Sequence, residues 1–483
     1  MSKRTKMLIV GSGGNGISLA SNLHQAGHSD FLIITKHSDF GGTWLQNTYP
    51  GCEVDCASSV YQFSFSPNPD WSALFVRQPE LKSYMQRVAA ENGLYERTLF
   101  DCEMTYARWD QSNCGWLVDT TQGPILAEHL MLATGFLEEA VVPRIEGMET
   151  FTGRHFHSSQ WPVGYTGANE RIAVVGSGSS AIQIVPELQK YASHVFQFQR
   201  TPTWLLPKNN RVLSLAERQR LAASAEEMEN HRLVVFEQEE ELWQNTFVSM
   251  NGEEYEQLAL AHLEQEIVDP ELRRLLTPTH PIGCKRPLVS DNYYRSLTAP
   301  NVELVPEAVA RIDDNSVITA GGRVFEVDAI VFATGFYFGG HILNTVERRD
   351  GQTVGDYQAG HPRAYKAVSV AGCPNLYLVG GPAPNGQIWN GLYPGEAVGT
   401  YVLNILDYLQ RTSLRALEVK EEAERAWKRA ADAVLDQAPV VAGGCTNYSQ
   451  DASGHNKAAW PGTLRSMTTE LSMFDPDKYE TIG

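Results

Sequence analysis

The chain carries the same glycine-rich turn twice, each time directly after a short apolar run. The first turn, Gly11-Ser12-Gly13-Gly14-Asn15-Gly16, follows Met7 to Val10, and the second, Gly176-Ser177-Gly178-Ser179-Ser180-Ala181, follows Ile172 to Val175. Strand, glycine turn and helix in that order are typical of a βαβ unit that binds a dinucleotide, because the glycines let the backbone approach a pyrophosphate and the helix N-terminus attracts it. The sequence therefore predicts two dinucleotide-binding folds in one chain.

The two units have the same internal plan. The first predicts strands at 7–10 and 31–35 around a helix at 15–26, and the second predicts strands at 172–175 and 194–199 around a helix at 179–191. Each later reaches an apolar strand followed by Ala-Thr-Gly-Phe, at 133–136 and at 333–336, which would close the fold and lead into a crossing linker. We expect an α/β protein with two Rossmann-like domains.

The domain boundaries follow from this repeat and from composition. Residues 1–142 form the first part of the first domain, 143–165 a linker, 166–336 the second domain, and 337–483 a return to the first domain with a C-terminal segment. Residues 214–280 are rich in Glu, Ala, Leu, Gln and Arg, which favours a helical insertion in the second domain. The stretch 396–437 predicts helix, and the tail from 438 predicts irregular structure.

The charge and the apolar pattern exclude several classes of protein. A net charge of −18 disfavours nonspecific binding of nucleic acid, which needs clustered Lys and Arg. The sequence has no signal-peptide core before the first strand and no apolar run near the length of a membrane span, so we expect a cytoplasmic protein without membrane contact. Its oligomeric state is not determined by the sequence.

The seven cysteines are odd in number and scattered along the chain, so they predict reduced, buried thiols and not a disulfide framework. Cys52 and Cys56 have three residues between them, which is neither a thioredoxin nor a zinc-ribbon spacing. No metal site is expected.

The end of the second strand in each unit predicts which nucleotide binds. Thr35 and Arg200 each lie 24 residues after the first glycine of their unit. Arg200 is a cation where NAD-binding folds carry an acid, so it fits a 2′-phosphate, with Thr201 as a further donor, and the second site predicts NADP. At the first site Thr35 replaces the acid and can bond a ribose hydroxyl, and the nearby Gly41-Gly42-Thr43-Trp44 favours FAD.

A third signature lies between the two glycine turns. Phe151, Gly153, His157, Trp161 and Pro162 match the pattern F-x-G-x-x-x-H-x-x-x-W-P. With these residues the chain resembles the Baeyer–Villiger type of flavin monooxygenase over nearly its whole length. Residues 41–55 also resemble that family's G-G-T-W … Y-P-G-x-x-x-D stretch, and the tail from Cys445 to Tyr448 and from Trp460 to Gly462 resembles the C-terminal segment of one of its branches. The signature is expected in the linker, coupling domain motion.

The resemblance implies roles for individual residues. Asp55 stands at the family's active-site aspartate, Arg286 at its catalytic arginine and Lys285 at the lysine that faces the NADP phosphate, a match that Tyr293 and Tyr294 continue. The full set implied to bind the cofactors is Gly11, Gly13, Gly16, Thr35, Gly42, Thr43, Trp44, Asp55, Tyr61, Gly176, Gly178, Ser179, Ser180, Arg200, Thr201 and Lys285.

Three further residues are expected near the substrate. Trp389 and Tyr393 would line its pocket. Glu53 replaces the small or basic residue common in the family and would alter the preference for substrate charge.

The implied chemistry is NADPH-dependent oxygen transfer through a C4a-peroxyflavin, which inserts one atom of O2 into a ketone and gives an ester or lactone. Arg286 would stabilise the negative charge on the peroxide and on the adduct, with Asp55 orienting it.

Three alternatives remain open from the sequence. An N- or S-oxygenase, acting for example on a small amine, would use the same scaffold, and Glu53 and Thr35 keep it open. A pyridine-nucleotide–disulfide reductase would need Cys52 and Cys56 as a redox pair. A non-catalytic nucleotide-binding sensor would bind nucleotide without oxygen uptake.

Overall fold

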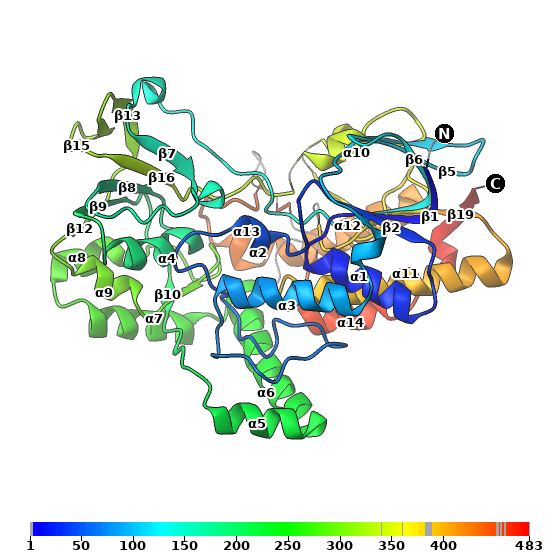
Figure 1. Cartoon of the computed structure of the whole chain (residues 1–483), viewed down its shortest axis with the longest axis horizontal. Helices are drawn as coiled ribbons and strands as arrows, with labels where there is room; N and C mark the ends of the chain where they lie inside the picture. The colour runs from blue at the N-terminus through cyan, green and yellow to red at the C-terminus, as the bar shows by residue number, and fades with distance from the viewer. Residues whose placement is uncertain are drawn as a thin grey trace.

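Both glycine turns join a buried strand to a helix, as the sequence predicts. The computed structural model describes residues 3–339, 341–359, 361–381, 389–450, 454, 456–457 and 460–482. In these ranges β1 (Lys3–Val10) leads into α1 (Gly14–Gln25), and β8 (Arg171–Val175) leads into α4 (Ser179–Leu188). The two units belong to two α/β domains that lie side by side (Figure 1).

The first domain is built on a mixed sheet in the order β17-β4-β5-β6-β1-β2-β3, with β18 paired to the end of β6. The strands around β1 run parallel to it, whereas β4, β5 and β6 form an antiparallel meander. Besides β1, the strands are β2 (Phe31–Ile34), β3 (Thr98–Leu99), β4 (Met104–Asp110), β5 (Gly115–Thr120), β6 (Ile125–Leu132), β17 (Val346–Glu347) and β18 (Leu376–Leu378). β17 and β18 join this sheet from the part of the chain that follows the second domain.

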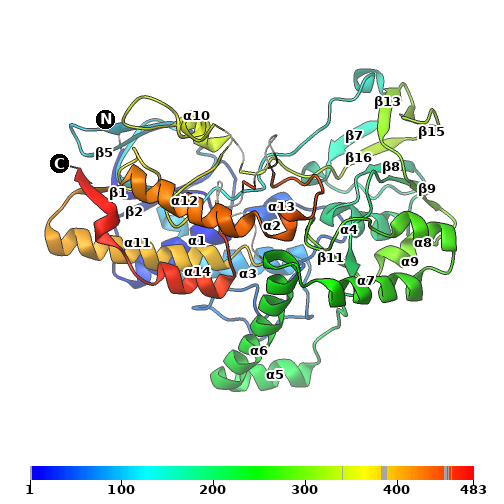
Figure 2. The same cartoon turned by 180° about the vertical axis from the view of Figure 1, so that it is seen from behind.

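Helices cover the first domain. α11 packs against α1, the helix that follows the first glycine turn (Figure 2). The predicted helix at 396–437 is two helices separated by a strand, and the tail expected to be irregular contains two helices and a strand. The elements are α2 (Thr43–Gln46), α3 (Gln78–Glu91), α10 (Val354–Gln358), α11 (Tyr393–Thr412), β19 (Ala416–Val419), α12 (Glu421–Leu435), α13 (Pro439–Ala442), α14 (Leu464–Leu471) and β20 (Tyr479–Ile482).

The second domain holds a five-stranded parallel sheet in the order β12-β9-β8-β16-β7. Its strands are β7 (Arg154–His157), β9 (His194–Phe198), β12 (Val302–Val305) and β16 (Ala329–Phe332) beside β8, and α9 (Tyr293–Leu297) packs with α4. This domain also contains two smaller sheets. One is an antiparallel meander of β13 (Val309–Asp313), β14 (Ser316–Thr319) and β15 (Val324–Glu326), and the other is a pair formed by β10 (Leu205–Leu206) and β11 (Leu288–Val289).

The helical insertion is present where composition predicts it. It contains α5 (Leu215–Ala223), α6 (Ala225–Trp243), a π-helical turn at Gln244–Val248, α7 (Glu253–Glu266) and α8 (Pro270–Leu276). α5 and the start of α6 project from the body of the molecule, and the other end of α6 reaches the junction between the domains (Figure 1). None of the helices within the described ranges combines the length and apolarity needed to cross a membrane.

The Ala-Thr-Gly-Phe repeats occupy equivalent places. Gly11 has φ +119° and Gly176 has φ +128°, and a Cβ on either would lie 2.3 Å from a carbonyl oxygen, that of Ala133 or of Ala333. Only glycine fits so close to the neighbouring strand. The repeat therefore reflects a duplicated packing of turn against strand.

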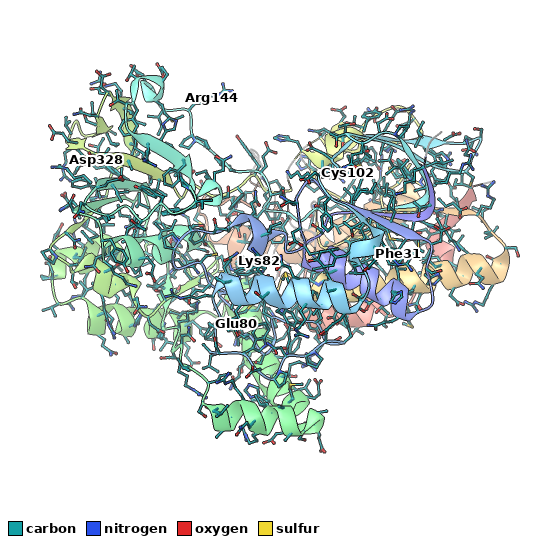
Figure 3. The ribbon with its side chains drawn as sticks, in the orientation of Figure 1. Phe31, Glu80, Lys82, Cys102, Arg144 and Asp328 are labelled. Atoms are coloured by element: carbon teal, nitrogen blue, oxygen red, sulfur yellow. A yellow bond between two sulfur atoms is a disulfide. The ribbon has the colours of Figure 1, made fainter. Side chains whose placement is uncertain are left out.

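Two connections cross between the domains, and they pair with each other. The amide of Val141 donates to the carbonyl of Gly335 at 2.8 Å, and the amide of Tyr337 donates to that of Glu139 at 2.8 Å. Figure 3 labels Arg144 on the first of these connections, Phe31 and Cys102 in the first domain and Asp328 in the second. The paired segments directly follow the two Ala-Thr-Gly-Phe repeats.

Candidate cofactor sites and catalytic centre

The first glycine turn meets two other segments that the sequence selects. A Cβ on Gly42 would lie 2.7 Å from the Cα of Gly13, so the two backbones touch. Trp44 at the start of α2 donates its indole N–H to the Tyr61 hydroxyl at 3.1 Å. Burial raises the pKa of Tyr61, so its phenol stays protonated. The turn, the Gly-Gly-Thr-Trp stretch and Tyr61 thus form one cradle.

Thr35 supports the first glycine turn from a buried position at the end of β2. It is 3% exposed, and its hydroxyl oxygen accepts hydrogen bonds from the Ser12 hydroxyl at 2.9 Å and from the His37 amide at 3.3 Å. The side chain therefore braces the glycine turn against the end of β2. A contact between Thr35 and a ribose stays a prediction.

The second turn leaves open space beside an uncapped helix. Gly178 is the N-cap of α4 and receives no capping side chain, and a Cβ on Gly178 would meet no atom within 4 Å. The Ser177 hydroxyl donates to the carbonyl of Thr201 at 3.2 Å, which ties the turn to the end of β9. Free helix amides next to empty space fit a pyrophosphate.

Two cations gather near the end of β9. Arg200 is exposed, and the pKa of Lys285 is lowered by its burial and by the positive charge of Arg200. Neither is paired with a carboxylate in the part of the chain that the structure describes. Two adjacent cations from separate segments repel each other until an anion lies between them. Their arrangement fits the 2′-phosphate of NADP, as the sequence predicts.

Asp55 and Arg286 form an ion pair across the domain junction. The Arg286 Nη2 lies 3.0 Å from Asp55 Oδ2 and also donates to the carbonyl of Trp389 at 3.4 Å. Burial is the largest single influence and lowers the pKa of Arg286, but Asp55, together with Tyr448 and Cys56, raises that pKa above its usual value. The guanidinium therefore stays charged while about a quarter of its side chain remains exposed.

A third carboxyl, Glu239 on α6, lies near this pair, and sequence reasoning missed it. Its Oε1 accepts the amide of Ala57 at 2.9 Å. Burial raises the pKa of Glu239 to about 7; the Asp55 carboxylate raises it further, while the Ala57 amide and the Arg286 guanidinium oppose the rise. Glu239 stands in a run of glutamates on a helix whose composition is typical of an exposed one. No signal in the sequence therefore indicates that Glu239, and not a neighbouring glutamate, lies near the ion pair.

The neighbouring Glu240 anchors Trp389. Glu240 is 7% exposed, and its carboxylate accepts the Trp389 indole N–H at 2.7 Å and the Arg465 amide at 2.8 Å. Phe236, one turn earlier on α6, contacts the rings of Trp389 and Tyr393 at centroid distances of 5.4 and 5.3 Å. The two aromatics expected at the substrate pocket therefore pack against the helical insertion, with the backbone of Trp389 touching Arg286.

Glu53 does not face a substrate as an unpaired carboxylate. Its Oε1 lies 2.7 Å from Nζ of Lys208, whose side chain is 1% exposed. The expected effect of Glu53 on substrate charge is therefore corrected, because Lys208 neutralises it.

The signature between the domains is not a linker throughout. Residues Arg154–His157 form β7 at the edge of the second sheet, paired with β16. His157 is fully buried, and its ring nitrogens lie 2.9 Å from the Ser159 hydroxyl and 3.0 Å from the carbonyl of Gly335. The signature thus packs on the second Ala-Thr-Gly-Phe repeat, at the start of a crossing connection. Spacing alone could not distinguish an edge strand from a linker.

The expectation of reduced cysteines is wrong for one pair. Cys284 and Cys445 form a disulfide, although 161 residues separate them, and the other five cysteines are buried free thiols. The bond joins the residue before Lys285 and Arg286 to the C-terminal segment, where the Asn447 side-chain amide donates to the Cys284 carbonyl at 3.1 Å. The contact exists only in the folded chain, so spacing could not predict it.

Cys52 and Cys56 do not look like a redox pair. Both are free and buried, and burial raises the pKa of Cys52 to about 12 and that of Cys56 well above its usual value. Thiol–disulfide chemistry needs a thiolate. This geometry disfavours the disulfide-reductase alternative.

Comparisons with known proteins agree with this arrangement. The family model described as "Pyridine nucleotide-disulphide oxidoreductase" matches residues 8–255. A Baeyer–Villiger monooxygenase from Pseudomonas aeruginosa is 36% identical, with 99% of this chain and 91% of the relative covered. The FAD-binding monooxygenase ktnD from Aspergillus niger is 32% identical, with 97% and 80% covered. The crystal structure of cyclohexanone monooxygenase from Rhodococcus sp. Phi1 bound to NADP+ has a TM-score of 0.88 at 25% identity, with 100% and 99% covered.

Two dinucleotide folds with a partly buried arginine–aspartate pair at their junction define a nucleotide-dependent oxidoreductase. The chain belongs to the pyridine nucleotide-disulphide oxidoreductases in the broad sense of that family model, and to the Baeyer–Villiger monooxygenases. The family resemblance and the fold class inferred from the sequence are confirmed.

Proposed function

We propose that this protein catalyses the NADPH-dependent Baeyer–Villiger oxidation of a ketone to an ester or lactone, with FAD in the first domain and NADP in the second. The observation that carries the proposal is Arg286, a partly buried guanidinium held by Asp55 at the junction of the two cradles. When bound, NADPH supplies a hydride and FAD supplies the activation of O2.

The residues of the chain have distinct tasks in this proposal. The turns at Gly11–Gly16 and Gly176–Ala181 bind the two pyrophosphates at helix N-termini. Arg200 and Lys285 select the 2′-phosphate. Arg286 faces the charge that develops during oxygen transfer, where removal of one donor typically costs about 100- to 1,000-fold in rate.

The aromatic packing beside Arg286 limits the access of water. Trp389 and Phe236 are both 5% exposed, and Tyr393 packs beside them. A site with little water strengthens the electrostatic attraction between the guanidinium and a developing oxyanion. It also limits side reactions with water that would consume the activated oxygen without forming product.

Amine or sulfide oxidation loses part of its support. The case for a small charged amine came from Glu53 and Thr35, and the Glu53 carboxylate lies 2.7 Å from the Lys208 ammonium, which neutralises it. Ketone oxidation is therefore the function that the geometry supports best. The partners are a small molecule and O2, and a cytoplasmic location stays a prediction.

Anaerobic reduction followed by oxygen tests the proposal. The purified protein is reduced with NADPH under argon and then mixed with O2 and a library of ketones, amines and sulfides. We expect flavin bleaching by NADPH and product masses 16 units above those of ketones. Oxygenated amines alone would replace this function by the alternative, and a colourless protein that takes up no flavin would refute both.

A further inference from the structure

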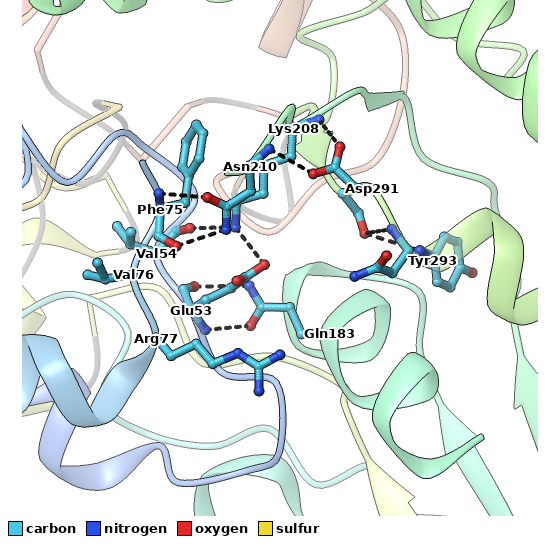
Figure 4. A network of polar contacts seen from close by, with 12 residues as sticks. Glu53, Val54, Phe75, Val76, Arg77, Gln183, Lys208, Asn210, Asp291 and Tyr293 are labelled. Carbon is cyan, nitrogen blue, oxygen red and sulfur yellow. Dashed lines mark hydrogen bonds and ion pairs between the residues drawn. The ribbon is translucent and has the colours of Figure 1, made fainter. Parts of the chain in front are cut away.

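A buried ammonium from the second domain reaches into the first-domain loop that carries Asp55. The Lys208 Nζ donates to the carbonyl of Val54 and lies next to Glu53 Oε1, both at 2.7 Å (Figure 4). Removing an ammonium from water is costly, so it persists only where its partners are well placed. Here the partners are the two residues that immediately precede Asp55.

The second domain holds this loop on both sides of Asp55. Before Asp55, Gln183 on α4 donates to the Glu53 carbonyl at 3.0 Å, and Lys208 holds the carbonyl of Val54. After Asp55, Glu239 accepts the amide of Ala57 at 2.9 Å. Since Arg286 also comes from the second domain, the domain that supplies the guanidinium also sets the backbone of its carboxylate partner.

Lys208 is itself fixed in place. The Asp291 carboxylate accepts the amides of Lys208, Asn209 and Asn210 at 3.0, 2.8 and 2.8 Å. The ammonium lies 4.9 Å from the centroid of the Phe75 ring. Because these contacts restrict the conformation of Lys208, the position of the second domain determines where its ammonium holds the loop.

We propose that Lys208 is a positioning residue, which fixes the Val54 carbonyl and thereby the direction in which Asp55 meets Arg286. This inference rests on the proposed function for its effect on turnover, but its effect on the loop is independent of that function. Glu53 neutralises the ammonium.

The test compares four proteins: wild type, Lys208→Met, the double variant Lys208→Met/Glu53→Gln, and Asn210→Ala. Methionine keeps an unbranched side chain of similar bulk but lacks the ammonium, and Glu53→Gln removes the carboxylate that Lys208→Met leaves unpaired. Asn210→Ala is the matched control, because it removes the paired hydrogen bonds with the Phe75 backbone at 3.0 and 2.9 Å, at the same domain interface but away from Asp55.

Two readouts are measured on protein with flavin bound. Turnover per bound flavin and product formed per NADPH consumed should fall by about tenfold or more in Lys208→Met, because a misplacement of ~1 Å at a reacting centre costs up to about 100-fold. The KM for NADPH should stay within about twofold, since the tethering of the loop, not nucleotide binding, is lost. Amide hydrogen exchange in residues 52–58 should rise.

The double variant and the control decide the interpretation. We expect the double variant to remain defective and Asn210→Ala to keep its product yield and its exchange in 52–58. Recovery in the double variant would assign the defect to an unpaired charge and overturn the proposal, as would unchanged exchange in Lys208→Met. If wild type oxygenates no ketone, the proposed function fails, while the exchange data still test the tether.

Discussion

The buried carboxyl of Glu239 gives a pH-dependent prediction whose size follows from the structure. Its pKa is about 7 in the folded protein against 4.5 for a free glutamate. A difference of ~2.5 units at ~1.36 kcal/mol each corresponds to about 3 kcal/mol, and solvent reaching the half-buried side chain reduces the effect to about 2 kcal/mol.

The sign follows from proton uptake. Between about pH 4.5 and 7 the folded state keeps the Glu239 proton that the unfolded state releases, so the free energy of unfolding falls as the pH rises through this window. Gln cannot titrate, and it preserves an oxygen for the Ala57 amide. Relative to wild type, Glu239→Gln should therefore gain about 2 kcal/mol between pH 5 and pH 8.

The assay is urea unfolding of wild type and Glu239→Gln at pH 5 and pH 8. The difference between their free energies of unfolding is compared at the two pH values, so that the contributions of other titrating groups cancel. The groups that face Glu239 are Asp55, Arg286 and the Cys56 thiol, and all are unchanged in the variant. Glu241→Gln, on the exposed side of the same helix, is the control and should show no pH-dependent difference. An equal Glu239→Gln effect at both pH values would refute the assignment of a raised pKa.

Three more predictions concern cofactors and the disulfide. Arg286→Ala should remain yellow and be reduced by NADPH, yet lose oxygenated product by about 100-fold or more, and a normal yield would remove its assigned role. Arg200→Ala should raise the KM for NADPH far more than that for NADH, whereas equal changes would mean that it does not bind the phosphate. Cys284→Ser/Cys445→Ser should unfold with up to about 4 kcal/mol less free energy than the oxidised wild type and be insensitive to dithiothreitol. A melting point equal to that of oxidised wild type would show that the bond contributes nothing.

Local sequence patterns predicted the parts of the fold that depend on residues close together in the sequence. The Gly11 and Gly176 turns, with their apolar strands, have fixed spacing, because the close approach of turn to strand admits only certain residues. Composition alone located the helical insertion. Spacing did not show that β7 pairs with β16 or that a strand separates α11 from α12, since pairing partners are distant in sequence.

The candidate site divides in the same way. Asp55 and Arg286 were identified because each lies in a stretch that resembles the family, and the structure brings them to 3.0 Å. Lys208 and Glu239 carry no such pattern: a lysine in a polar loop and a glutamate in a run of glutamates are usually solvated, and only burial makes them important.

The sequence by itself determined two dinucleotide folds and the family, and it predicts Arg200 as the cation that selects a 2′-phosphate, because these inferences depend on backbone geometry and residue type within short segments. Only the tertiary structure decided which charges are paired, which carboxyl holds a proton near neutral pH and which cysteines are joined. Those properties depend on desolvation and on contacts between distant segments, such as Asp55 and Arg286, which are 231 residues apart.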